Sequence, residues 1–108
     1  MKRNMDTIRL LLLHAEGGDE AVAAEYAKLL EPERVEHERL LVEAGLAGAQ
    51  NAEAPLRLTW AGHDFLDSIR NEPLWRKVKR KVLKPKASWT FDILKAWLAA
   101  EIRRRLDM

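Results

Sequence analysis

Several features that would point to a chemistry or a location are missing from this sequence. The 108 residues include no cysteine, which excludes disulfides, thiolate metal sites and cysteine nucleophiles. Apolar runs such as Leu10–Leu13 are far shorter than the roughly 20 residues of a membrane-spanning helix. Asp6 and Arg9 interrupt the N-terminal segment, so we expect no signal peptide. We therefore expect a cytoplasmic protein that makes no membrane contact.

Catalytic motifs are also missing. The chain has five glycines, and the pair Gly17–Gly18 follows a predicted helix instead of the strand that precedes a phosphate-binding loop. His63 and Asp67 lie one helical turn apart, but tight metal binding needs more converging ligands, and we interpret the pair as structural. No nucleophile elbow and no carboxylate pair with evident roles is present. The sequence predicts a protein that is not an enzyme and that needs no metal or cofactor.

Charge is unevenly distributed along the chain. Residues 1–54 contain six basic and eleven acidic residues, a net charge of −5. Residues 55–108 contain thirteen basic and six acidic residues, a net charge of +7. Such an uneven distribution of charge can steer a partner or orient two copies of a protein, but it does not determine a fold.

Apolar residues recur at helical spacing over most of the chain. The pattern predicts helices over residues 7–16, 20–30, 32–44, 60–70, 72–83 and 91–106. Their expected caps and first-turn residues are Asp6, Asp19, Pro32, Thr59, Asn71 and either Ser88 or Thr90. Gly45 is expected to follow the third helix in a left-handed conformation, and Lys84–Lys86 is expected to end the fifth.

Two short segments between the third and fourth helices have strand character. Residues 46–49 and 56–59 flank the loop sequence QNAEAP. In the second segment Leu56 and Leu58 alternate with a polar residue, as in an antiparallel strand with one buried face. Gly62, in the first turn of the next helix, is expected to permit close backbone packing against this hairpin.

The order of these elements predicts a mainly α protein with a small β-wing. We expect a winged helix-turn-helix core over residues 5–70. A two-helix C-terminal extension over residues 71–108 would complete a single domain of residues 1–108.

Five segments carry a resemblance to a known family. They are MKRNMD (1–6), LLVEAGL (40–46), LTWAGHDFLDSIR (58–70), WRKVK (75–79) and SWTFDILKAWL (88–98). Together they resemble a family of small bacterial and prophage proteins of unknown function with a winged-helix fold. The resemblance implies this fold and a phage or prophage origin, and it implies no reaction.

The third predicted helix carries an excess of negative charge, which is unusual for a helix that reads DNA. Its expected outward residues are Glu33, Arg34, Glu36, His37, Glu38 and Glu43. Because contact with phosphates favours cations, this helix favours a protein partner: a host protein, a basic subunit or the basic half of the chain itself. The alternative is a DNA-binding transcriptional regulator that reads bases through Arg34, His37 and Glu38. Arg57, Lys2–Arg3 and the fifth helix would then contact phosphates.

The fifth predicted helix is strongly basic. Its cations are Arg76, Lys77, Lys79, Arg80 and Lys81. They form a solvated helix face, a site for an acidic protein or for self-association, or a nucleic-acid contact. A homodimer through residues 91–106 is a further alternative. The four tryptophans are expected to pack inside the protein, and Trp89 is the best candidate for an exposed anchor.

Overall fold

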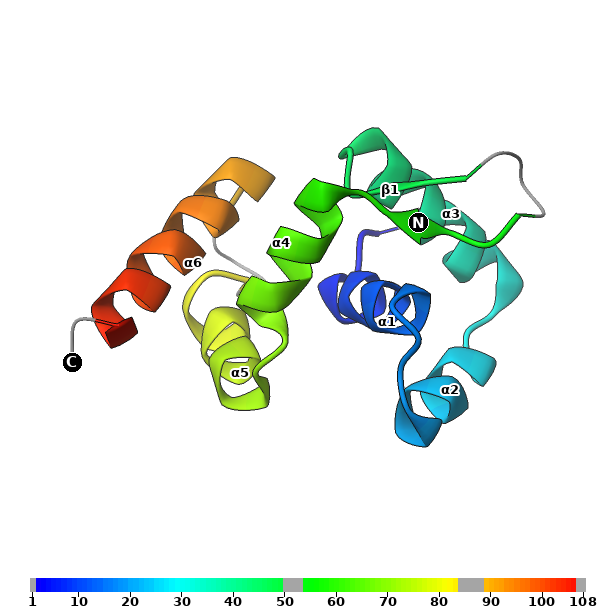
Figure 1. Ribbon diagram of the computed structural model, residues 1–108, viewed down its shortest axis with the longest axis horizontal. Coiled ribbons are helices and arrows are strands. Elements are labelled where there is room, and N and C mark those ends of the chain that lie inside the picture. The colour runs from blue at the N-terminus through cyan, green and yellow to red at the C-terminus, as the bar shows by residue number, and fades with distance from the viewer. Residues whose placement is uncertain (1, 50–53, 84–88, 107–108) are drawn as a thin grey trace. The chain divides into compact units, whose positions relative to one another are not determined.

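A computed structural model describes residues 2–49, 54–83 and 89–106. These residues form α1 (Met5–Ala15), α2 (Glu20–Ala27), α3 (Glu31–Glu43), β1 (Ala47–Gly48), β2 (Arg57–Leu58), α4 (Trp60–Ile69), α5 (Glu72–Lys81) and α6 (Phe91–Leu106), as Figure 1 shows. The expectation of a mainly helical chain with a small β element is confirmed. None of the helices in these ranges has the length and apolarity needed to cross a bilayer.

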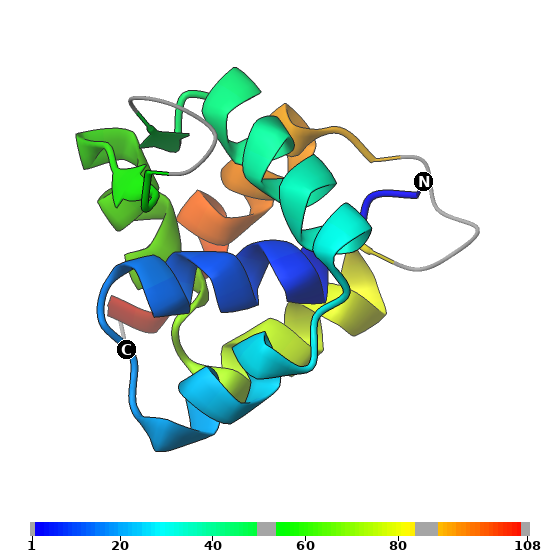
Figure 2. The ribbon, with the colours of Figure 1, turned by 90° about the vertical axis from the view of Figure 1, so that its right-hand side faces the viewer.

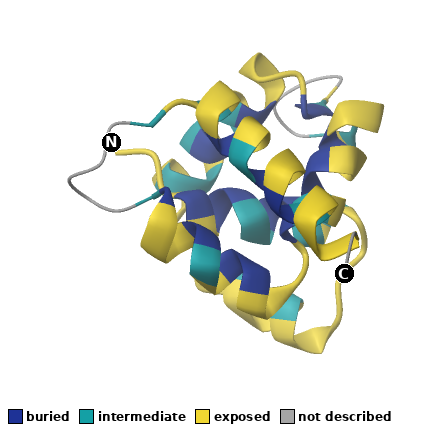
Figure 3. Ribbon diagram, turned by 90° about the vertical axis from the view of Figure 1, so that its left-hand side faces the viewer, coloured by how far each residue is buried: buried dark blue, intermediate teal, exposed yellow. Residues whose placement is uncertain are grey.

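The chain forms two compact units, residues 1–66 and 67–108. The boundary between the units lies inside α4. In the first unit α1 contacts both α2 and α3 (Figure 2). The helices other than α2 each bury residues on one side, and Figure 3 marks buried residues in dark blue. The largest side chains fully buried in this unit are Leu11, Leu12, His37, Leu41 and Leu66.

Helix α1 begins two residues earlier than the sequence predicted. The N-cap is Asn4 and not Asp6, because the Asn4 side-chain oxygen accepts hydrogen bonds from the backbone N–H groups of Asp6 (2.9 Å) and Thr7 (3.3 Å). The earlier start places Met5 in the helix, where its side chain is buried. The predicted cap of α2 is confirmed, since Asp19 accepts from the N–H of Val22 at 3.0 Å.

The end of α3 leads directly into the sheet. Gly45 has a φ of +77°, as expected, and the next N–H, that of Leu46, donates to the Leu41 carbonyl at 3.0 Å. Strands β1 and β2 then pair antiparallel, with Ala47 opposite Leu58 and Gly48 opposite Arg57. Both strands are two residues long, shorter than the predicted segments, and residues 50–53 of the predicted loop lie outside the described residues.

The first turn of helix α4 packs directly against the backbone that connects α3 to β1. The Thr59 hydroxyl accepts from the N–H of Gly62 at 3.0 Å, which confirms Thr59 as the N-cap, and it donates to the Gly45 carbonyl at 2.6 Å. A Cβ atom at Gly62 would lie 1.9 Å from the carbonyl oxygen of Leu46. The predicted need for glycine at this position is therefore confirmed.

The second unit contains the end of α4 together with α5 and α6. Asn71 caps α5 by accepting from the N–H of Leu74 at 2.9 Å, and Thr90 caps α6 by accepting from the N–H of Ile93 at 3.2 Å. Its buried apolar side chains are Ile69, Leu74, Trp75, Val78, Val82, Leu94 and Leu98. The other cap candidate, Ser88, and the expected helix end at Lys84–Lys86 lie outside the described residues.

Candidate interaction surfaces

Both arginines of α3 are paired with glutamates of the same helix. Arg34 donates to Glu38 at 2.7 Å, and both side chains are about three-quarters buried. Arg39 contacts Glu36 at 2.5 Å and also contacts Glu43. The hydrogen bond from Arg39 lowers the pKa of Glu36, and the same bond raises the pKa of Arg39. With five glutamates and two arginines between residues 31 and 43, the helix offers a partner an excess of negative charge.

His37 does not face outward, and our expectation for its orientation is wrong. Its side chain is fully buried between α1 and α3. Nε2 accepts from the backbone N–H of Asn4 at 2.9 Å, so Nδ1 carries the proton and donates to the Glu33 carbonyl at 2.7 Å. Beside it, the Thr7 hydroxyl donates to the Glu33 carboxylate at 2.8 Å. The histidine therefore fixes α3 to the N-terminus of α1 and is not available to a partner.

The exposed side of α3 carries two valines. Val35 is 49% exposed and Val42 is 46% exposed, and their spacing of seven residues places them on one side of the helix. Arg39 lies between them along the helix. We define the α3 face as Val35, Glu36, Arg39, Val42 and Glu43. Val35 therefore lies outside the apolar core, although it is an apolar residue of a packed helix.

Trp60 is the most exposed large hydrophobic residue that the structure describes. Its exposed fraction is 85%, although we expected the tryptophans to pack inside. It directly follows Thr59, whose hydroxyl donates a hydrogen bond to the carbonyl of Gly45, two residues after the end of α3. The sequence did contain a signal for this exposure. At helical spacing, position 60 lies on the side of the helix opposite to the inward residues Phe65, Leu66 and Ile69. The expected anchor, Trp89, is only partly exposed.

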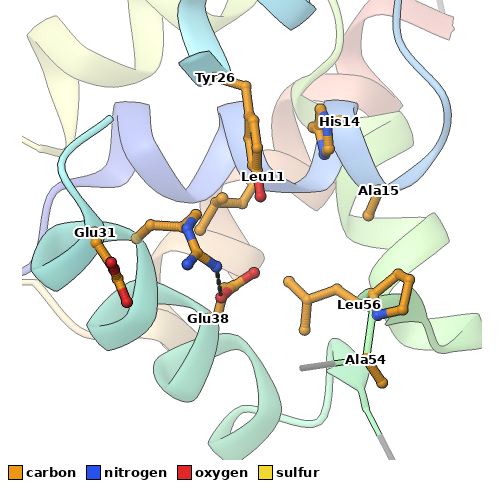
Figure 4. A pocket seen from close by; sticks show the side chains of 10 residues that line it. Leu11, His14, Ala15, Tyr26, Glu31, Glu38, Ala54 and Leu56 are labelled. Atoms are coloured by element: carbon orange, nitrogen blue, oxygen red, sulfur yellow. Dashed lines mark hydrogen bonds and ion pairs between the residues drawn. The ribbon is translucent and has the colours of Figure 1, made fainter. Parts of the chain in front are cut away.

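A hollow of about 590 Å³ lies between α1, α2, α3 and the residues that enter β2 (Figure 4). Tyr26 stacks on His14 with ring centroids 3.6 Å apart, and the Arg34–Glu38 pair lies in the same lining. Two of the three predicted base-reading residues therefore line a concave surface and bind each other. The remaining lining residues are Leu11, Ala15, Glu31, Ala54, Pro55 and Leu56.

The structure brings one basic residue of α5 and two of α6 together around one carboxylate. Glu101 is 7% exposed and accepts from Lys77 at 2.6 Å and from Arg104 at 2.5 Å, with Arg105 Nε at 3.6 Å. The hydrogen bonds from Lys77 and Arg104 lower the pKa of Glu101 to about 2. In the sequence Lys77 is one of several cations of α5, and no local pattern indicates its ion pair with Glu101 of α6, 24 residues further along the chain.

The remaining predicted contact residues lie in two places. Arg76, Lys79, Arg80 and Lys81 are exposed on α5, and Arg76 has Glu72 at 3.9 Å. Arg57 is exposed on β2 in the first unit. Among the described residues, no three histidine, aspartate or glutamate side chains come together in a way that could hold a metal ion.

The two compact units carry opposite charge. Residues 1–66 contain seven basic and twelve acidic residues, a net of −5. Residues 67–108 contain twelve basic and five acidic residues, a net of +7. The charge asymmetry of the sequence therefore follows the structural division of the molecule.

Comparison with known proteins places the chain in a family. No solved structure matches it. A Haemophilus influenzae protein named "Uncharacterized protein" is 33% identical in an alignment 106 residues long, and the alignment covers 88% of this chain and 90% of that protein. Residues 2–88 match the family described as "Hypothetical protein (DUF2513)". The chain therefore belongs to the DUF2513 family.

Proposed function

We propose that this chain is a non-enzymatic winged-helix protein, encoded by phage or prophage, that acts by binding another protein through the α3 face. The order of three helices, an antiparallel hairpin and a fourth helix supports the winged-helix assignment. The resemblance to small prophage proteins supports the origin.

The observation that carries the proposal is the pair of half-exposed valines on α3. They lie in a helix whose arginines are already paired with its own glutamates. Desolvated apolar side chains surrounded by a charged rim are typical of protein interfaces. The excess of carboxylates favours a partner with basic residues around an apolar centre.

A regulator that reads bases with α3 is less well supported. Arg34 and Glu38 bind each other, and His37 is buried. Direct readout needs side chains that reach base edges from the exposed side of the helix. On that side Arg39 is the cation, and it is held between Glu36 and Glu43.

Site-specific photocrosslinking in the native host tests the proposal. A benzoylphenylalanine residue would replace Val35 or Val42, with Ala24 on the exposed side of α2 as the matched control position. We expect one and the same protein to crosslink from both valine positions and not from the control. Crosslinks to DNA, or identical products from all three positions, would contradict the proposal.

Binding measurements on the purified pair would then use paired substitutions. The double variant Val35→Asp, Val42→Asp should weaken binding at least about tenfold, because it places two charges in the centre of the interface. Ala24→Asp should leave the affinity unchanged. Far-UV circular dichroism checks that α3 stays folded in both variants.

A further inference from the structure

We infer that α5 and the last turns of α6 form one basic surface that binds the phosphodiester backbone of a nucleic acid, independently of the α3 face. The surface consists of Arg76, Lys77, Arg80 and Lys81 on α5 with Arg104 and Arg105 on α6, and we call it the basic surface.

Contacts at Glu101 make this surface continuous across the two helices. Lys77 of α5 and Arg104 of α6 both donate to its carboxylate, at 2.6 and 2.5 Å. Arg105 approaches the same oxygen at 3.6 Å. One negative charge therefore holds three positive ones, and the cluster keeps a net charge of +2. Because Glu101 is nearly buried, it positions the cations while they stay closer to solvent.

The cations of α5 extend this cluster along its helix. Arg80 and Lys81 follow Lys77 within one turn, and both are exposed. Arg76 precedes it and has a carboxylate only at 3.9 Å, a distance too long for a strong hydrogen bond. Arginine guanidinium groups match phosphate oxygens with two parallel hydrogen bonds, which favours a phosphate ligand.

The composition of the exposed side of α5 favours a nucleic acid over an acidic protein. No large apolar residue of α5 is exposed, since Leu74, Trp75 and Val78 are all buried. Protein interfaces usually have an apolar or aromatic centre, whereas binding to a polyphosphate is driven by the release of counterions. The α5 part of the basic surface should therefore bind nucleic acid with little sequence preference.

The test measures fluorescence anisotropy of a random-sequence DNA duplex at several salt concentrations, with an RNA duplex as a second probe. Each phosphate contact contributes about −0.9 to the slope of log K against log salt concentration. Two double variants, Arg76→Gln with Arg80→Gln and Arg104→Gln with Arg105→Gln, should each make the slope shallower by about 1.8, the effect of two lost contacts. The stronger of the two probes identifies the class of nucleic acid.

The matched control removes two cations from the other unit, Lys28→Gln with Arg57→Gln, and should leave the slope unchanged. Absence of duplex binding at low salt would overturn the inference, as would equal slopes in wild type and in the α6 variant. A polyglutamate peptide that displaces the duplex at equal charge concentration would also overturn it, in favour of an acidic protein.

A second measurement covers the case in which the α6 variant fails to fold. In wild-type protein, amide NMR signals of Lys77, Arg104 and Arg105 should shift when duplex is added. Unchanged signals at Arg104 and Arg105, with shifts on α5, would contradict a surface shared by the two helices.

Discussion

At the scale of single residues, a few side chains and one missing side chain fix how the first unit fits together. Asn4 caps α1 and donates its own backbone N–H to His37 of α3. Thr59 joins the end of α3 to the start of α4. Gly62 lets the backbone of α4 approach the Leu46 carbonyl. Each of these contacts can be tested by one substitution.

Gly62→Ala should destabilise the protein by at least about 2 kcal/mol, because the added methyl group would overlap a backbone carbonyl that cannot move independently of the sheet. Gly48→Ala is the matched control, since nothing lies within 4 Å of a Cβ atom there. Urea unfolding of both variants measures the difference. Equal stability of the two variants would contradict the close approach.

His37→Leu should cost about 1–3 kcal/mol, because it leaves the partly buried N–H of Asn4 without its acceptor. The control is His63→Leu on the exposed side of α4, for which we expect a change within about 0.5 kcal/mol. Thermal unfolding compares them. If both substitutions have the same small effect, the link between α1 and α3 is not important for stability.

Local signals made some of these residues predictable and long-range partners made others unpredictable. Asp19, Thr59 and Asn71 were predicted as caps because a cap depends only on the residues that follow it. The burial of His37 depends on Asn4, which lies 33 residues earlier, so no local pattern contained it. Polar residues on a helix are expected outside unless a buried partner is known.

At the scale of secondary-structure elements, α3 and α6 each differ from the pattern of their sequences. Helix α3 was predicted to have outward glutamates, and Glu43 is exposed as expected. Its apolar residues divide, however: Leu41 is buried and Val35 is not. The apolar residues of α6 divide in the same way, since Leu94 and Leu98 are buried while Ile93 is half exposed. The spacing of apolar residues predicts a helix, but packing against neighbouring elements determines which side of that helix is buried.

The ion-pair cluster of α5 and α6 makes the stability of the second unit depend on pH. The folded-state pKa of Glu101 is about 2, below the ordinary value of 4.5. The carboxylate therefore contributes its full stabilisation above pH 4.5 and loses it as the pH falls from 4.5 towards 2. We expect wild-type protein to be more stable than Glu101→Gln at neutral pH.

Urea unfolding of wild type and Glu101→Gln at several pH values measures this effect. The difference between their midpoints should be constant above about pH 5 and should shrink steadily below it, as the carboxylate is protonated. Amide NMR signals of residues in α5 and α6, followed during the same unfolding experiment, show directly when the second unit unfolds. A difference that does not change with pH would mean that the charge of Glu101 has no role in stability.

At the scale of the whole molecule, the two compact units have opposite charge and present different kinds of surface. The first unit is acidic and exposes valines on α3, whereas the second is basic and exposes cations on α5 and α6. The charge asymmetry could be read from the sequence because it needs only a count. The joining of Lys77 to Arg104 could not, because it depends on how α5 packs against α6.

Together, the two proposals give the protein two binding surfaces of different chemistry. The α3 face would bind a protein with a basic rim, and the basic surface would bind a phosphate backbone. Because the two surfaces are made of different residues in different units, a substitution in one should leave binding at the other unchanged.

The most direct test of this account is an amide NMR titration of the wild-type protein with a random-sequence DNA duplex at low salt. We predict shifts in α5 and in the last turns of α6, with the signals of residues 35–42 unchanged. Shifts concentrated in residues 35–42 would show that α3 contacts DNA, and they would contradict the assignment of the α3 face to a protein partner.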